Sequence, residues 1–377
     1  MNRNTINLIF FIITLNFSFS QDNKIEKFKG FFDFTYNQSK DKIFLNVDKL
    51  DYEFLYVGSL ASGVGSNDIG LDRGQLGSER LVKFVKKGNK LLLIEPNLYY
   101  RAETENKSEK KSVEQAFAKS VIFGFEIIES KEDSYLIDIT PFLMYDRHGV
   151  AKKLRDSKQG IYKVDKSKSA IEIENTKAFP ENVEFEALLT FSGEAKGNLI
   201  RSVTPDPNNI TVFQHHSFIK LPDNNYKPRK FDPRSGAIPI SYMDYSTPID
   251  EPITKKYIIR HRLEKKNPEL DISEAIEPII YYLDPGTPEP VKSALLDGGK
   301  WWNQAYESIG FKDAFQVKML PEGVDPLDCR YNVIQWVHRS TRGWSYGASV
   351  VDPRTGEIIK GHVSLGSLRI RQDYMIA

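Results

Sequence analysis

Short segments of strand length, separated by loops rich in Pro, Asp and Asn, dominate the chain from residue 31 to residue 270. Residues 31–36, 42–47 and 53–57 form a short alternating set, and strand-length segments such as residues 183–191 and 210–221 continue the pattern of β-strands between turns. Residues 80–85 and 90–95 predict a hairpin that turns at Gly88. We therefore expect most of the chain to be built from β-strands.

A Gly-rich loop at residues 58–77 divides this β-rich region. We expect a small β-rich module at residues 21–77 and a larger β-rich module of uncharacterised function at residues 78–271. The character of the sequence changes near residue 272, so a third part is expected at residues 272–377.

This third part predicts a mixed α/β layer around one long helix. Apolar residues fall on one face of residues 291–309, Thr287 can cap the helix, and Gly310 can end it. Gly298 and Gly299 weaken a helix, which we attribute to close approach to a sheet. The strands expected beside the helix are residues 278–284, 315–320 and 332–338.

The last residues predict a further strand and a further helix. Ile359, Val363 and Leu365 share one face of an alternating segment, and the polar residues Lys360, His362 and Ser364 share the other. This pattern is typical of a half-buried strand near a sheet edge. A helix beginning at Ser367 has no C-terminal Gly and no cationic last turn. We interpret the chain as the front part of a larger protein that continues beyond Ala377.

The first 20 residues predict a signal peptide. Arg3 supplies a positive charge, residues 6–17 are almost all apolar, and small residues precede Gln21. The apolar run is too short to span a bilayer comfortably, so we expect cleavage before Gln21 and an extracytoplasmic protein, periplasmic or secreted. No other segment of the sequence predicts a membrane span.

Charge and cysteine content exclude several classes of protein. Without Arg3 the chain has 51 basic and 51 acidic residues, whereas nucleic-acid binding requires a basic surplus. Cys329 is the only cysteine, so an internal disulfide or a cysteine-based zinc cluster is not expected.

The six histidines have no spacing of three or four residues on a predicted helix, so no His-Glu-x-x-His motif is present. His215 and His216 are adjacent in a predicted strand and should point to opposite faces. We expect the histidines to be surface or partly buried polar residues, and no metal ligand or catalytic residue is assigned within the chain.

Residues 343–347 read Gly-Trp-Ser-Tyr-Gly and match the G-x-S-x-G pattern of serine hydrolases. That chemistry requires a buried strand before the serine and a helix after it. A polar loop precedes Ser345 and a strand is predicted after it. A serine hydrolase using Ser345 is therefore the less favoured alternative.

Four strings of sequence resemble a known family. They are LASGVGSNDIGLDRGQLGSER (residues 60–80), IEPNLYYRA (94–102), FDPRSG (231–236) and RYNVIQWVHRSTRGWSYGASVVDPRTGEIIKGHVSLGSLRIRQDY (330–374). With them the chain resembles the N-terminal portion of secreted bacterial zinc-dependent metalloproteases of the met-zincin type. In that family three His of a His-Glu-x-x-His-x-x-Gly-x-x-His motif bind zinc, and the Glu acts as general base.

The resemblance implies an α+β fold. The β-rich modules would precede the incomplete first subdomain of a zincin-like catalytic domain, a mixed sheet with a long helix. It implies zinc as cofactor with ligands beyond Ala377, and a peptide or protein substrate. It also implies that an edge strand aligns the substrate. Its residues would be Gly361, His362, Val363, Ser364, Leu365 and Gly366.

The expected function is zinc-dependent endopeptidase activity of a longer protein, with residues 1–377 inactive alone. A non-enzymatic exported β-rich binding module is the main alternative.

Overall fold

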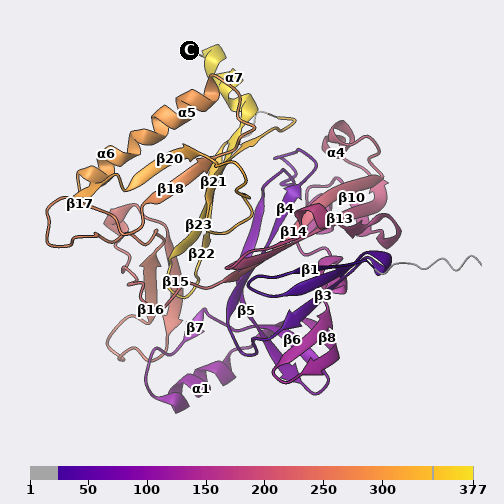
Figure 1. The fold of residues 1–377 in the computed structure, drawn as a ribbon, viewed down its shortest axis with the longest axis horizontal. Helices are drawn as coiled ribbons and strands as arrows, with labels where there is room; N and C mark the ends of the chain where they lie inside the picture. The colour runs from indigo at the N-terminus through magenta and orange to yellow at the C-terminus, as the bar shows by residue number, and fades with distance from the viewer. Residues whose placement is uncertain (1–23, 342–343, 377) are drawn as a thin grey trace, which may run out of the picture.

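The computed structural model describes residues 24–341 and 344–376 (Figure 1). The predicted signal peptide and the expected cleavage before Gln21 lie outside the described residues.

A large antiparallel sheet forms most of the molecule. Its strands are β1 (Ile25–Phe28), β2 (Phe34–Asn37), β3 (Lys42–Val47), β4 (Phe54–Ser62), β5 (Leu76–Lys87), β6 (Lys90–Glu95), β8 (Ser120–Lys131), β9 (Ser134–Asp138), β10 (Gly160–Val164), β11 (Ala170–Ile171), β12 (Lys177–Ala178), β13 (Asn182–Ala195) and β14 (Asn209–Lys220). Their order is β1-β2-β3-β9-β8-β6-β5-β4-β14-β13-β10, and β11 and β12 also pair with β13. The predicted hairpin is confirmed as β5 and β6, and both long predicted strands are confirmed as β13 and β14.

The sheet curls around a core of aromatic side chains. Phe34 in β2 packs on Phe185 in β13, with ring centroids 5.0 Å apart. Strands near the two ends of the sheet order are therefore in contact across the core. Phe54, Phe84 and Phe218 fill the interior and are fully buried. Burying each such ring stabilises the fold by about 1.5–3 kcal/mol.

The helices are short. They are α1 (Lys107–Ala116), α2 (Thr140–Leu143), α3 (Val150–Asp156), α4 (Asn198–Val203), α5 (Val291–Lys300), α6 (Trp302–Glu307) and α7 (Ser367–Ile376). Single-turn 3-10 segments lie at η1 (Gln38–Lys40), η2 (Lys166–Lys168), η3 (Ile173–Asn175) and η4 (Pro233–Ser235). Helices α3 and α4 contribute side chains to a second buried cluster beside β10, β13 and β14.

The remaining strands form smaller sheets, and all of them except β7 lie in residues 239–366. Strands β16 (Thr254–Ile258), β15 (Pro239–Asp244) and β7 (Tyr100–Arg101) make one, and β17 (Ser273–Glu274) and β19 (Phe311–Lys312) make another. The third has the order β20 (Phe315–Met319), β18 (Ile279–Leu283), β21 (Asn332–Val337), β23 (Ile358–Gly366) and β22 (Tyr346–Val351). In it only β22 is antiparallel to its neighbour. Figure 1 shows this sheet with α5 and α6 beside the large sheet.

The predicted α+β class, with a zincin-like subdomain built around a long helix, is wrong. The protein is mostly β-sheet, and the helix expected at residues 291–309 is two short helices that meet at Trp301. Two low-propensity glycines precede that break, and the N–H of Trp301 bonds to the carbonyl of Gly298, three residues back, as in a tightened 3-10 turn. The expected apolar face is not buried, since Ile309 is 64% exposed. Thr287 does not cap the helix, which begins at Val291.

The close approach expected at the glycines is confirmed for Gly299. A Cβ there would lie 2.4 Å from Cγ2 of Val317 in β20, whereas a Cβ at Gly298 would meet open space. Gly310, with φ of +85°, follows the helical segment in the left-handed conformation that favours glycine.

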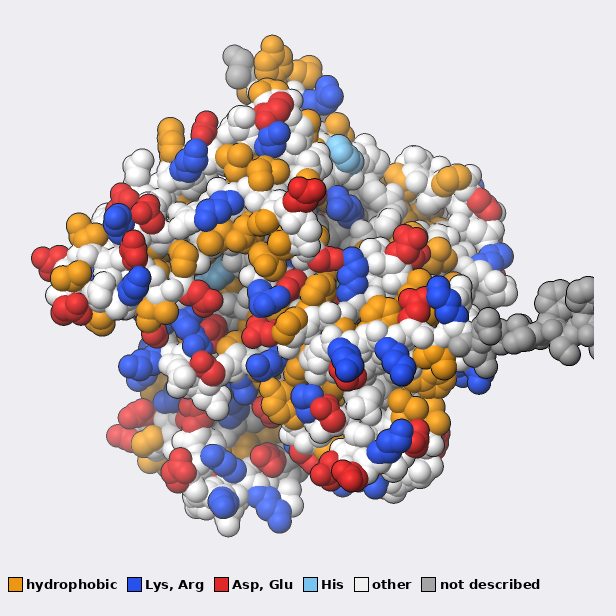
Figure 2. Space-filling model, viewed as in Figure 1, with side chains coloured by type: hydrophobic (Ala, Val, Ile, Leu, Met, Phe, Trp, Pro, Cys, Tyr) orange, Lys and Arg blue, Asp and Glu red, His pale blue; other side chains and the backbone are white. Residues whose placement is uncertain are grey.

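The boundary predicted between residues 77 and 78 falls inside β5, and strands from both sides of it belong to the large sheet. No helix among the described residues is long and apolar enough to cross a membrane. Figure 2 shows basic and acidic side chains interspersed over the visible face.

Candidate functional site

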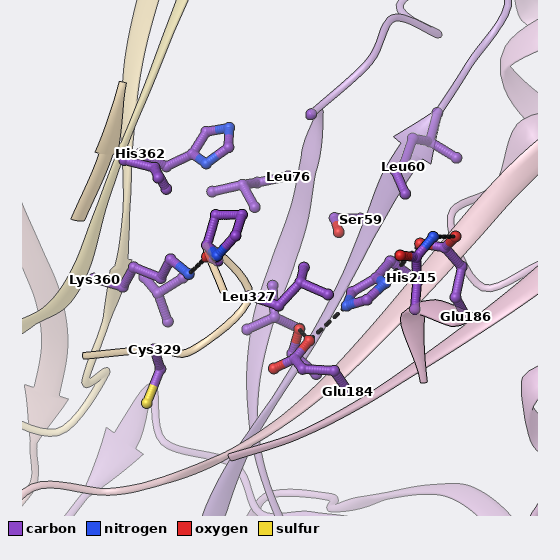
Figure 3. Close-up of a pocket in the computed structure, with 18 of the residues that line it drawn as sticks. Ser59, Leu60, Leu76, Glu184, Glu186, His215, Leu327, Cys329, Lys360 and His362 are labelled. Atoms are coloured by element: carbon purple, nitrogen blue, oxygen red, sulfur yellow. Dashed lines mark hydrogen bonds and ion pairs between the residues drawn. The ribbon is translucent and has the colours of Figure 1, made fainter. Parts of the chain in front are cut away.

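A cavity of about 400 Å³ lies where the large sheet meets the five-stranded sheet (Figure 3). Strands β4, β13 and β14 form one wall, and β21, β23 and residues 325–329 form the other. Figure 3 shows His215, Glu184 and Glu186 on the first side and Lys360 and His362 on the second. The cavity therefore brings together residues that are far apart in the sequence.

The first wall carries a buried ionic group that spans two paired strands. Glu186 in β13 is opposite His215 in β14, and Glu184 is two residues away on the same face of β13. Nε2 of His215 lies 2.6 Å from a carboxylate oxygen of Glu184, and Nδ1 lies 3.0 Å from a carboxylate oxygen of Glu186. We call Glu184, His215 and Glu186 the buried triad.

Neutral groups complete the hydrogen bonding of the buried triad. The hydroxyl of Ser217 donates to Glu184 at 2.6 Å, and the side-chain amide of Asn182 also donates to this carboxylate. The side-chain amide of Asn175 donates to Glu186 at 2.7 Å. Both carboxylates are therefore satisfied although each residue is only 2% exposed.

His215 is a cation at neutral pH because its two partners outweigh its burial. Burial alone lowers the pKa of an imidazole, but the hydrogen bonds to Glu184 and Glu186 raise the pKa of His215 to about 9. Both ring nitrogens then carry protons, and both donate. The buried triad has a net charge of about −1 in this state.

Lys360 gives the opposite wall a basic side chain. Nζ of Lys360 donates to the carbonyls of Pro326, at 2.6 Å, and Asp328, at 3.2 Å. Burial lowers the pKa of Lys360, and the charge of Glu184 across the cavity opposes that effect. Burial and the neighbouring Lys360 lower the pKa of His362 to about 4, so its imidazole is neutral.

The edge position expected for Gly361, His362, Val363, Ser364, Leu365 and Gly366 is wrong. These residues belong to β23, which pairs with β21 on one side and β22 on the other. A Cβ at Gly361 would lie 2.1 Å from the hydroxyl of Tyr281, so the strand is tightly covered. A substrate strand cannot add to β23 without displacing β22. Within this segment His362 lines the cavity.

Ser345 lies just before β22 and is exposed. Its hydroxyl accepts a hydrogen bond from the backbone N–H of Gly366 at 3.2 Å. Gly343 of the matching pattern lies outside the described residues. His338, which is near in sequence, bonds through Nδ1 to the hydroxyl of Ser367 at 2.8 Å instead. The strand after Ser345 is as expected and differs from the helix that a nucleophile elbow requires.

Within residues 24–341 and 344–376, no three His, Cys, Asp or Glu side chains are arranged to hold a metal ion. The buried triad has suitable residue types, but both nitrogens of His215 already bond to carboxylates. Neither lone pair is free for zinc, so this group does not fit a zinc site.

His215 and His216 lie on opposite faces of β14, which confirms the prediction from the sequence. His215 faces the cavity, whereas His216 contacts the hydroxyl of Tyr56 on the other side of the sheet. The expectation that both are surface or partly buried is wrong, because they are 3% and 0% exposed. The signal that was missed is Glu184 and Glu186, two acidic residues at alternate positions among the apolar residues of the segment 183–189.

The fold and the cavity define a predominantly β-sheet protein with a buried carboxylate–imidazolium–carboxylate group at the junction of two sheets. Residues 74–266, slightly more than half of the chain, match the family described as a domain of unknown function (DUF5117). The chain therefore belongs to the DUF5117 family. The match gives no indication of a metalloprotease. No curated protein and no solved structure matches the chain.

Proposed function

We propose that this chain is the peptide-holding part of an exported zinc-dependent endopeptidase, and that it binds extended polypeptide along β22. The observation that carries the proposal is the position of β22 at the end of the five-stranded sheet. Among the described residues it pairs with β23 and with no strand on its other side. Such an edge can accept a peptide as an additional strand through main-chain hydrogen bonds.

Only the first half of β22 is accessible for this role. Val350 and Val351 are buried, and Val350 packs in a cluster with side chains of the large sheet. Gly347 is exposed, and no atom would lie within 4 Å of a Cβ built on it. Trp344, just before the strand, is 63% exposed and offers an apolar surface beside the open edge.

The segment that leads into β22 is anchored to the rest of the protein. Nε of Arg339 lies 2.7 Å from the carboxylate of Asp72, and both side chains are buried. The guanidinium of Arg339 also donates to the carbonyl of Trp344 at 3.0 Å. This fixed approach supports the proposal, because a preorganised strand loses less entropy when a peptide binds.

Zinc would supply an activated water for peptide hydrolysis. The zinc ligands would lie in sequence after Ala377, as the family resemblance implies, and none would lie in residues 1–377. Within this chain, β22 would position the peptide main chain. In the alternative function, a non-enzymatic binding module, β22 would bind peptide in the same way and no hydrolysis would follow.

Peptide binding is tested with the full chain and fluorescently labelled, denatured casein. Binding should slow hydrogen–deuterium exchange in the accessible first half of β22, which begins at Tyr346, and leave β20, the other edge of the same sheet, unchanged. Gly347→Pro removes an N–H from the edge strand and should weaken binding about ten-fold or more, whereas Gly347→Ala keeps the N–H and should bind as the wild type does. Unchanged exchange in β22 with bound casein would exclude this edge.

The endopeptidase part is tested separately with protein that includes the sequence following Ala377. It should hydrolyse casein, lose activity to a chelator and recover with zinc. Casein binding without any chelator-sensitive hydrolysis would favour the binding module.

A further inference from the structure

A second cavity, of about 450 Å³, lies on the other face of the β4–β5 pair and is lined by basic side chains. Three of them are Arg80 from β5, Arg147 from the loop before α3, and Lys153 from α3. Its wall also includes His148, and none of its lining residues is acidic. The volume lies in the range of small-molecule sites, roughly 300–1,000 Å³.

Two glycines make the floor of this cavity. Gly58 in β4 and Gly77 in β5 face each other across the strand pair, and a Cβ at Gly77 would lie 2.7 Å from the carbonyl oxygen of Gly58. The absence of side chains at these two positions leaves the hollow open between Arg80 and His148.

His148 presents an unpartnered N–H in the cavity wall. The residue is 9% exposed, and its Nδ1 has no hydrogen-bond partner among the described residues. Nε2 lies 2.8 Å from Nζ of Lys153 and 3.2 Å from Oε1 of Gln75, and this oxygen also accepts from Lys153 at 2.8 Å. An ammonium group can only donate, so its shorter contact makes Nε2 the acceptor and places the proton of the neutral ring on Nδ1. Burial and the charge of Lys153 lower the pKa of His148 to about 4, which keeps the ring in this neutral form.

Arg147 is also held with an unused donor. Its Nε is buried without a hydrogen-bond partner in the described structure, and its guanidinium stacks on Phe142, with the carbon centre 4.6 Å from the ring centroid. The carboxamide oxygen of Gln214, a fully buried residue of β14, accepts the backbone N–H groups of both Arg147 and His148 at 2.8 Å. The loop is therefore fixed from beneath, and its two donors are preorganised.

Nearby carboxylates do not line the cavity. Glu95 pairs with one nitrogen of Arg80 at 2.7 Å, and Asp146 accepts the first N–H groups of α3. Asp72 pairs with Arg339. Burial lowers the pKa of Arg147, and the positive charge of nearby Arg80 acts in the same direction. A bound anion would relieve this like-charge repulsion.

We propose that this cavity binds the tetrahedral oxyanion group, phosphate or sulfate, of a small anionic ligand. Arg147 and the Nδ1–H of His148 donate to the oxyanion from the wall, Arg80 contacts it from the entrance, and Lys153 holds the imidazole tautomer. Each lining residue from Leu76 onward lies within the segment that matches the DUF5117 family. The site is on the opposite face of β4 and β5 from the triad cavity, and it does not depend on peptide binding at β22.

Isothermal titration calorimetry of the full chain with inorganic phosphate tests this assignment. Phosphate and sulfate should bind competitively, acetate should bind far more weakly, and added sodium chloride should weaken binding. Arg147→Gln and Arg80→Gln should each weaken phosphate binding about ten-fold or more, because each removes a charged donor. Arg80 lies at the surface, so its replacement tests the site even if Arg147→Gln impairs folding.

Arg155→Gln is the matched control. Arg155 is on α3 but outside the cavity, and its side chain is 60% exposed and paired with Asp156. This variant should bind phosphate as the wild type does. The proposal is overturned if tens of millimolar phosphate gives no binding heat, if acetate binds as tightly as phosphate, or if Arg155→Gln weakens binding as much as Arg80→Gln does.

Discussion

Replacing His215 with Leu should destabilise the protein by about 3–5 kcal/mol near neutral pH. The substitution removes the imidazolium that donates to Glu184 and Glu186, and each carboxylate residue is only 2% exposed. A buried carboxylate without its cation keeps the cost of desolvation and loses the attraction that offset it. The raised pKa of His215 corresponds to a loss of free energy of similar magnitude, because a rise from 6.5 to about 9 corresponds to about 3 kcal/mol.

The pH dependence of this effect has a definite sign. Folding raises the pKa of His215, so the stabilisation by the imidazolium is complete below the unfolded value of 6.5 and is lost as pH rises through about 9. The difference in unfolding free energy between the wild type and His215→Leu should therefore be largest below pH 6.5 and shrink as pH passes 9.

Urea unfolding followed by circular dichroism measures this difference at each pH. His338→Leu is the control, because His338 is exposed and its replacement should change stability by less than about 0.5 kcal/mol. Changing both carboxylates to Gln in the His215→Leu background should recover much of the loss, since no buried charge remains. A loss below about 1 kcal/mol near neutral pH, or one that stays constant as His215 titrates, would refute an imidazolium held by two carboxylates.

The other predictions concern packing, chemistry and export. Gly299→Ala should destabilise the protein by about 1–3 kcal/mol, because the new Cβ meets Val317. Gly298→Ala places its Cβ in open space and should stabilise the protein by about 0.5–1 kcal/mol. Thermal denaturation compares the two variants, and equal effects would contradict the close contact at Gly299. Ser345 should remain unlabelled by a fluorophosphonate probe, and labelling that is lost in Ser345→Ala would favour the serine-hydrolase alternative. Mass spectrometry of exported protein should find Gln21 at the N-terminus, and an intact Met1 would exclude cleavage.

Local patterns in the sequence were sufficient for several strands of the large sheet, although β1, β10, β11 and β12 were not predicted. Segments of strand length between turn-rich loops predicted β13 and β14, and the two-residue period of a strand placed His215 and His216 on opposite faces. A strand's side chains alternate whatever its neighbours are, so these predictions required no knowledge of pairing. The helix at residues 291–309 was less well predicted, because periodicity continues through Gly298 and Gly299 although the helix is interrupted soon after them.

Tertiary structure alone decided the sites. The alternation in β23 is the same for an edge strand and for an interior strand, and only its pairing with both β21 and β22 shows that it is interior. His215 meets Glu184 and Glu186 because β13 and β14 pair in one register, and a shift by one residue would turn these side chains to opposite faces. The basic cavity similarly joins β5 to the loop before α3, about 70 residues later in the chain. Strand formation follows from the pattern of one segment, whereas register and contact depend on packing between segments. The sequence by itself therefore determined the strands, and only the folded chain determined which side chains they bring together.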